Sequence, residues 1–139
     1  RDKKEIREHA KKMIQDLDIR CTGPQQLTGR LSGGNQQKVC LARALTLNPK
    51  VLFVSEPTRG IDIGAKKLVL DLLVQLSREK GMTIIITSSE LSELRSISDR
   101  IAIISKGTVA GILKPDDSDA DFGLLMSGLK RQGGEENER

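Results

Sequence analysis

The chain has 139 residues, a net charge of +4, 37% hydrophobic and 30% charged residues, two phenylalanines, and no tyrosine or tryptophan. This length fits one domain, and the shortage of aromatic rings argues against a nucleic-acid partner, because almost nothing is present to stack on bases. No apolar stretch approaches the length that spans a bilayer. Cys21 and Cys40 form no metal-ligand pattern, so a reduced, cytosolic setting is expected. The chain begins with Arg1 instead of methionine, which suggests a piece of a longer protein.

The first part of the chain is expected to form two helices, joined by a loop, and then a short strand. Apolar residues recur at helical spacing over 3–18 and predict an amphipathic helix. A loop rich in glycine and proline follows over 20–30. Ser32 then stands where an N-cap belongs, and a second helix is expected to run to about residue 47. The continuous apolar run at 51–54 predicts a buried parallel strand.

The remaining elements follow in the same alternating order. After a loop around Gly60, a helix of about fifteen residues is expected, with Gly81 just past its end. The residues expected on the buried face of this helix are Leu68, Val69, Leu72, Leu73 and Leu76. The later predicted elements are a buried strand at 83–87, a short helix at 89–97, a hairpin of 100–105 with 108–113, and a last helix opened by a capping box at Ser118 and Asp121. Alternating elements with apolar strands predict an α/β fold with a mainly parallel core sheet.

The segment Leu31-Ser32-Gly33-Gly34 has the composition of a phosphate-binding helix start. Backbone N–H groups and the helix dipole stabilise anions at such a start. Gly33 and Gly34 allow a phosphate to approach the backbone closely, and the Ser32 hydroxyl can hydrogen-bond to it. Taken alone, these residues also fit an ordinary glycine-containing loop with a serine cap.

Glu56 follows the apolar run at 51–54, separated from it only by Ser55. A strand that ends this way can direct a carboxylate into a site, where it orients a water for attack on a γ-phosphate. Taken alone, Glu56 also fits an ordinary glutamate at a strand end. The two segments together, separated by the length of a helix, favour the phosphate chemistry.

These motifs resemble those of the ABC transporter ATPase family. Residues 31–37 match its signature motif, 51–56 its Walker B strand and 59–62 its D-loop. The strings LSGGNQQKV and EPTRGIDIGAK, with TSSE and SDRIAII further on, resemble the second ATPase half of tandem bacterial importers of ribose-like and xylose-like sugars. Residues 122–128 also resemble the related nucleoside importers. The resemblance covers nearly all of residues 3–128.

The resemblance implies a role for each matched residue. In this family two ATPase halves enclose ATP head to tail, and the signature of one half closes over nucleotide held by the other. Glu56 would be the catalytic carboxylate, Ser55 its Walker B neighbour on the metal side, and Ser89 would occupy the switch position. Gly60 and Asp62 would belong to the D-loop, with Asp62 joining the two halves. The residues expected to contact ATP in trans are Leu31, Ser32, Gly33, Gly34, Asn35 and Gln36.

Three departures from the family pattern limit this interpretation. No G-x-x-x-x-G-K-[ST] loop occurs in the chain, so the 139 residues alone are expected neither to bind ATP tightly nor to hydrolyse it. Ser55 stands where the family usually has aspartate, and a neutral hydroxyl is a weaker partner for Mg²⁺. Ser89 stands where the family has a switch histidine. Weak hydrolysis in this half's own site is therefore expected.

The resemblance also implies the setting of the intact protein, with ATP and Mg²⁺ as its cofactors. Its expected partners are a second ATPase half, a transmembrane permease and, indirectly, an extracellular or periplasmic substrate-binding protein, at the cytoplasmic face of the bacterial membrane. We assign 1–48 to the helical subdomain and signature helix, 49–129 to the core-sheet part and 130–139 to a disordered polar tail.

Two other functional classes stay open for this chain: a catalytically degenerate regulatory or dimerisation half, and a DNA-repair or chromosome-structure ATPase. The last class is disfavoured because its members carry long coiled coils beside the signature, whereas residues 1–18 hold at most two heptads.

Overall fold

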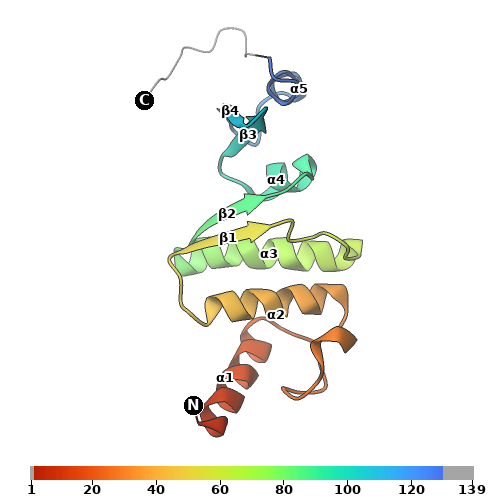
Figure 1. The fold of residues 1–139 in the computed structure, drawn as a ribbon, viewed down its shortest axis with the longest axis vertical. Helices are drawn as coiled ribbons and strands as arrows, with labels where there is room; N and C mark the ends of the chain where they lie inside the picture. Colours follow the sequence, from red (N-terminus) through yellow and green to blue (C-terminus); the bar gives the residue numbers. More distant parts are fainter. Residues whose placement is uncertain (1, 130–139) are drawn as a thin grey trace. The chain divides into compact units, whose positions relative to one another are not determined.

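The computed structural model describes residues 2–129, so the predicted tail at 130–139 lies outside the described residues. The contacts divide the chain between Ser89 and Glu90 into two compact units, and each is described by itself. The first unit contains α1 (Lys3–Asp16), η1 (Thr28–Arg30), α2 (Gly33–Leu45), β1 (Val51–Ser55), α3 (Ile63–Lys80) and β2 (Thr83–Thr87) (Figure 1). The second contains α4 (Leu91–Ile97), β3 (Ile101–Ser105), β4 (Thr108–Leu113) and α5 (Asp119–Met126).

In the first unit, α1 and α2 are each opened by a side-chain cap. The Asp2 carboxylate accepts a hydrogen bond from the N–H of Lys4, and the Ser32 hydroxyl accepts one from the N–H of Asn35. The Ser32 cap predicted from the sequence is therefore confirmed. The two helices meet in a small core made mainly by Leu17, Ile19 and Ala42.

The strands β1 and β2 pair in parallel, with Val51 opposite Thr83 and Ser55 opposite Thr87. The helix α3 connects them, capped by Asp62 at its start and ended by Gly81, which lies just past its end as predicted and adopts the left-handed conformation. Leu52 on β1, Val69 and Leu73 on α3, and Leu41 on α2 belong to one buried cluster. The sheet, α3 and α2 thus form successive layers (Figure 1).

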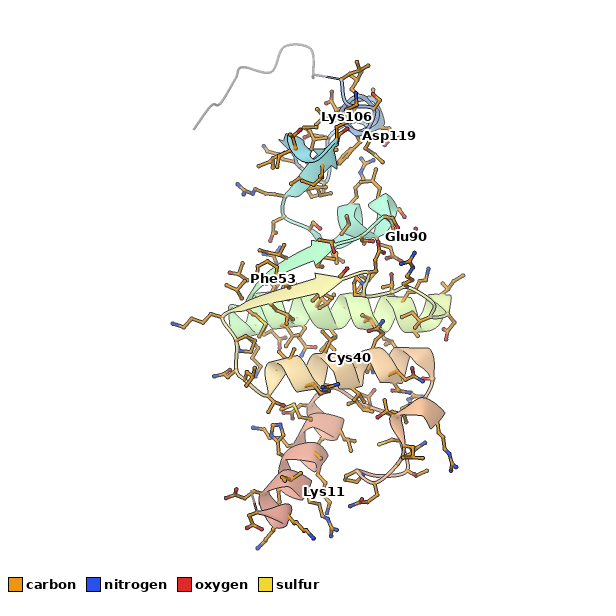
Figure 2. All side chains as sticks on the ribbon, in the orientation of Figure 1. Lys11, Cys40, Phe53, Glu90, Lys106 and Asp119 are labelled. Atoms are coloured by element: carbon orange, nitrogen blue, oxygen red, sulfur yellow. The ribbon has the colours of Figure 1, made fainter. Side chains whose placement is uncertain are left out.

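The opposite face of this sheet is exposed, so the prediction of fully buried strands is wrong. Val51, Phe53 and Ile85 lie on that face and are 47%, 75% and 45% exposed. Figure 2 labels Phe53 on β1. The apolar run predicts two covered faces, but within residues 2–129 the first unit packs a helix against only one. The burial expected for Leu68 is also wrong, since it is 53% exposed, whereas Val69, Leu73 and Leu76 are buried as predicted.

The second unit is built on the predicted hairpin. β3 and β4 pair antiparallel, with Ile101 opposite Leu113, and a bulge interrupts the register between Ile103 and Ile104. Its core contains Ile101, Ile103 and Leu113 from the strands with Phe122 and Leu125 from α5. The Ser118 hydroxyl caps α5 by accepting from the N–H of Asp121, as predicted. The helix α4 starts at Leu91, two residues later than expected.

Arg95 on α4 holds the segment between β4 and α5. Its guanidinium donates to the carbonyl oxygens of Pro115 at 3.0 Å and Asp117 at 2.7 Å. It also pairs with the carboxylate of Asp119 and lies 4.6 Å above the ring of Phe122. One side chain thus connects α4, the loop and α5.

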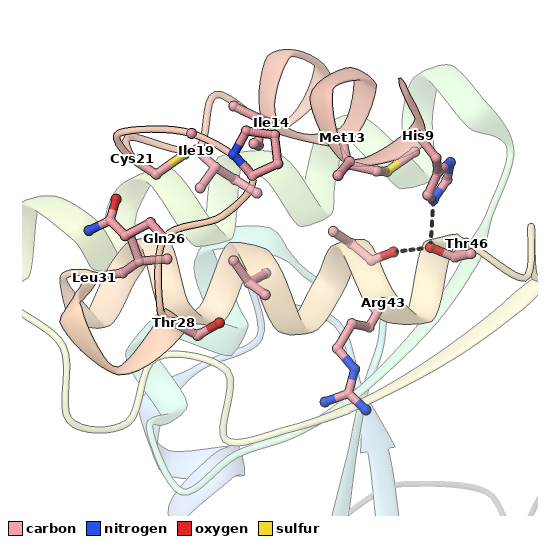
Figure 3. Close-up of a pocket in the computed structure, with 15 residues that line it drawn as sticks. His9, Met13, Ile14, Ile19, Cys21, Gln26, Thr28, Leu31, Arg43 and Thr46 are labelled. Carbon is pink, nitrogen blue, oxygen red and sulfur yellow. Dashed lines mark hydrogen bonds between the residues drawn. The ribbon is translucent and has the colours of Figure 1, made fainter. Parts of the chain in front are cut away.

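A cavity of about 220 Å³ lies between α1, the loop after it and α2 (Figure 3). Its walls are mainly apolar and include Met13, Ile19 and Val39. At one end, His9 Nε2 lies 2.9 Å from Thr46 Oγ1, and the Thr46 hydroxyl donates to the carbonyl of Ala42. Because the single hydroxyl proton of Thr46 is used there, His9 Nε2–H is the donor of the pair.

Within residues 2–129, none of the helices combines the length and the apolar character required to cross a membrane.

Candidate functional site

Ser32 and the first turn of α2 form the signature segment of the candidate site. Ser32 is exposed and extended, and its Oγ accepts hydrogen bonds from Asn35 N at 3.3 Å and Asn35 Nδ2 at 2.8 Å. The N–H groups of Gly33 and Gly34 belong to the first turn, where no helix carbonyl can accept them. This geometry places a hydroxyl and two backbone donors at one helix start, as a phosphate-binding segment requires.

The side chains of Asn35 and Gln36 bond to the protein. Asn35 Oδ1 accepts from the N–H of Arg20 at 2.9 Å, while Asn35 Nδ2 donates to Ser32. Gln36 Nε2 donates to the carbonyl of Leu31 at 3.0 Å. Both amides are therefore engaged in holding the segment around Ser32 in place.

Gly33 and Gly34 have a packing reason to be glycine. A Cβ on Gly33 would lie 2.7 Å from Cγ2 of Ile61, and a Cβ on Gly34 would lie 2.6 Å from Cβ of Ala65. Both distances are shorter than side-chain carbons tolerate. The two glycines therefore let the start of α2 approach the D-loop and the start of α3. Ala65 is absent from the predicted site residues, because nothing in the sequence pattern indicates this approach.

Glu56 lies at the end of β1 in the left-handed conformation, with φ of 45°. Its N–H donates to the carbonyl of Thr87 at 2.7 Å, and its carboxylate accepts from the N–H of Ser89 at 3.0 Å. The hydroxyl of Ser88 also lies 3.5 Å from the second carboxylate oxygen. The structure thus brings Glu56 and the switch-position Ser89 together. Ser88 is absent from the predicted site residues, because only the β1–β2 register brings it beside Glu56.

The D-loop residues have local structural roles. Gly60 has φ of 74°, which favours glycine at this turn. The Asp62 carboxylate accepts from the N–H of Ala65 at 2.9 Å and so caps α3. These contacts order the D-loop within this chain. The role of Asp62 between two ATPase halves stays a prediction.

Within residues 2–129, Ser55 and Glu56 are the side chains expected on the metal side of the site. Ser55 offers a neutral hydroxyl at the end of β1, and the Glu56 carboxylate is bonded to Ser88 and Ser89. Among the described residues there is no cluster of three or more His, Cys, Asp or Glu side chains that could hold a metal ion. Mg²⁺ commonly takes one or two carboxylates together with waters and substrate phosphate oxygens, so Ser55 and Glu56 could supply at most part of its coordination.

Residues 2–59 match the family model described as ABC transporter. The nucleoside import ATP-binding protein NupA of Lactococcus lactis is 40% identical over 128 residues, which cover 91% of this chain and 25% of the relative. The ribose import ATP-binding protein RbsA of the same species is 43% identical over 117 residues, which cover 84% of this chain and 24% of the relative. The chain thus spans about a quarter of the length of these curated relatives.

The fold is similar to that of solved ATP-binding cassettes. A dimeric ATP-binding cassette in a post-hydrolysis state, bound to ADP and phosphate, aligns with a TM-score of 0.71 and 26% identity. The alignment covers 85% of this chain and 50% of the solved one. The family match, the similarity to the import ATP-binding proteins and the shared α/β fold agree with one another. The chain belongs to the ABC transporter ATPase family.

Proposed function

We propose that this chain supplies the signature motif to a composite ATP site in an ABC-type importer of a sugar or nucleoside. The cargo class comes from the similarity to ribose and nucleoside import ATP-binding proteins. ATP hydrolysis in the intact protein would drive the transport. The residues proposed to act on nucleotide held by the other half belong to the segment Leu31, Ser32, Gly33, Gly34, Asn35 and Gln36.

The observation that carries this proposal is the start of α2. Ser32 is exposed there, beside two N–H groups that the helix does not use. A polyphosphate is rich in acceptor oxygens, and a helix start that offers several donors stabilises its negative charge. The signature segment can therefore bind phosphate even though the chain has no G-x-x-x-x-G-K-[ST] loop.

The remainder of the assembly follows from the same proposal. A second ATPase half would hold the ATP and its Mg²⁺, a transmembrane permease would carry the cargo, and a substrate-binding protein outside the membrane would deliver it. The ATPase would lie at the cytoplasmic face of the membrane. Within it, residues 1–48 would form part of the helical subdomain with the signature helix, and residues 49–129 part of the core.

The site that contains Glu56 is proposed to hydrolyse ATP weakly. The Glu56 carboxylate is bonded to the backbone of Ser89, and Ser55 adds no second carboxylate beside it. A catalytic carboxylate would have to release such a bond before it could orient a water. The principal catalytic role of this half would then be the one its signature segment plays in trans.

The experiment compares Ser32→Ala with Glu56→Gln in the full-length protein assembled with its partner half and permease. Ser32→Ala should lower ATP turnover by about 10- to 100-fold, because a hydrogen bond to a charged group contributes about 1.5–3 kcal/mol. Glu56→Gln should change turnover by less than about threefold, a small effect by the same measure. Gln75→Ala, an exposed amide on α3, is the control that should leave turnover unchanged.

Equal damage from Glu56→Gln and Ser32→Ala would contradict the asymmetry between the two sites. An undiminished turnover for Ser32→Ala would contradict the signature role itself. A bulky substitution at Gly34 is a weaker test, since it would clash with Ala65 whether or not a phosphate binds nearby.

A further inference from the structure

Asn35 bonds in two directions from the first turn of α2. Its side chain lies 2.9 Å from the N–H of Arg20 on one side and 2.8 Å from the Ser32 hydroxyl on the other. The backbone N–H of Arg20 can only donate, so the atom that faces it must be the amide oxygen. The amide NH₂ of Asn35 must then face Ser32, and the direction of that hydrogen bond is determined.

This direction determines which hydrogen bonds the Ser32 hydroxyl can still make. A hydroxyl can accept two hydrogen bonds and donate one. Ser32 Oγ already accepts from Asn35 N and from Asn35 Nδ2, so its accepting capacity is used. Its proton is the bonding capacity that remains, and Ser32 is exposed. The side chain can therefore act toward a ligand only as a donor.

The backbone on the other side of Asn35 is itself held firmly. Lys38, one turn further along α2, is only 6% exposed and donates from Nζ to the carbonyl of Asp18 at 2.9 Å. The segment from Asp18 to Arg20 is thus attached to α2 at two points, by Lys38 and by Asn35. An amide between a fixed backbone N–H and a hydroxyl cannot rotate without breaking both bonds.

We propose that Asn35 is a positioning residue that fixes Ser32 as a hydrogen-bond donor toward the fully ionised oxygens of a nucleotide polyphosphate. This inference rests on the proposed function of the signature segment. Within that segment, Asn35 would act on the nucleotide through Ser32 and not by its own contact with phosphate, because both ends of its amide are bonded to protein. The Ser32 side chain cannot accept a hydrogen bond from a ligand group that donates. It can donate to a phosphate oxygen, which only accepts, and its hydroxyl is already oriented to do so.

The test is a double-mutant cycle on Ser32 and Asn35 in the full-length ATPase with its partner half and permease. Asn35→Asp keeps an oxygen for the N–H of Arg20 but removes the donor to Ser32, so the Ser32 proton turns inward to the carboxylate. In the otherwise unchanged protein, Ser32→Ala should lower kcat/KM for ATP by at least about tenfold. In the Asn35→Asp background, adding Ser32→Ala should lower kcat/KM for ATP by less than about twofold, because the Ser32 hydroxyl no longer donates to the phosphate.

The charge introduced by Asn35→Asp is present in both members of the second pair, so its repulsion of phosphate cancels from that comparison. Asn35→Ala is the second variant, used if the acidic one does not assemble. It releases the Ser32 hydroxyl to rotate, so Ser32→Ala should then cost clearly less than in the unchanged protein.

The outcomes separate the two proposals. If Ser32→Ala lowered kcat/KM for ATP about tenfold in both the unchanged protein and the Asn35→Asp protein, the positioning role would be wrong and the proposed function would stand. No cost in the unchanged protein would overturn the proposed function, and the positioning role with it. If Asn35 only anchored Arg20, Ser32→Ala would lower kcat/KM by the same factor in the Asn35→Asp background as in the unchanged protein, because the carboxylate still accepts from the N–H of Arg20.

Discussion

At the scale of single residues, Glu56 has the most constrained backbone of the candidate site. The left-handed conformation costs a residue other than glycine on the order of 1–3 kcal/mol. Here its N–H and its carboxylate are both bonded to the segment that follows β2. These contacts offset the cost and fix where the carboxylate lies. A strained residue held in this way is typical of a functional site.

Gly34 leads to a prediction of compensation. Gly34→Ala should lower the free energy of unfolding by about 1–3 kcal/mol, because the new methyl group overpacks against Ala65. Adding Ala65→Gly should recover most of that loss of packing. The measurement is urea unfolding of the protein followed by far-UV circular dichroism.

Gly123→Ala is the matched control for this pair. Gly123 also lies in a helix, but a Cβ there meets no atom within 4 Å. Alanine has the higher helix propensity by about 1 kcal/mol, so Gly123→Ala should stabilise the protein. If Gly34→Ala also stabilised it, the close contact between α2 and α3 would be disproved.

At the scale of elements, the second unit depends on a single side chain that connects three of its parts. The guanidinium of Arg95 reaches two loop carbonyls, the carboxylate of Asp119 and the ring of Phe122. Phe122 is itself 1% exposed and belongs to the core of the unit. The loop carbonyls that Arg95 satisfies would otherwise depend on water.

Arg95→Ala should therefore destabilise the second unit by about 2–4 kcal/mol, since it removes charge-assisted hydrogen bonds and the contact with Phe122 together. Hydrogen exchange at the amides of α5 measures this, and their protection should fall. Asp119→Ala is the control: its side chain is 94% exposed, so the lost ion pair should have little effect. Equal effects of the two changes would show that only the ion pair matters.

At the scale of the whole chain, the exposed face of the β1–β2 sheet is the largest departure from an ordinary buried α/β sheet. Phe53 and Ile85 are directly opposite each other in the register and are 75% and 45% exposed. The other face carries Leu52, which is 6% exposed and packed against α3. Among the residues that the structure describes, one apolar face of this sheet is covered and the other is not, and uncovered apolar surface promotes association.

Phe53→Thr should raise the solubility of the 139-residue chain and change its midpoint of thermal unfolding little, because threonine keeps the strand propensity and removes exposed apolar area. Leu52→Ala, one residue away on the covered face, should lower the stability by about 2–5 kcal/mol. Static light scattering and thermal unfolding measure the two effects. A large loss of stability in Phe53→Thr would show that this face is packed.

The sequence by itself determined the order of the elements, the caps at Ser32 and Ser118, the helix end at Gly81, and the two motifs that identify the family. These features are local: a cap, a turn or a period depends on residues close together in the chain. Three-dimensional proximity decided the rest. It showed that Gly34 meets Ala65, that Glu56 bonds to Ser89, that Asn35 uses its amide on Arg20 and Ser32, and that one strand face is uncovered. The partners in such contacts lie on different elements, and no local pattern records which residue will lie opposite another.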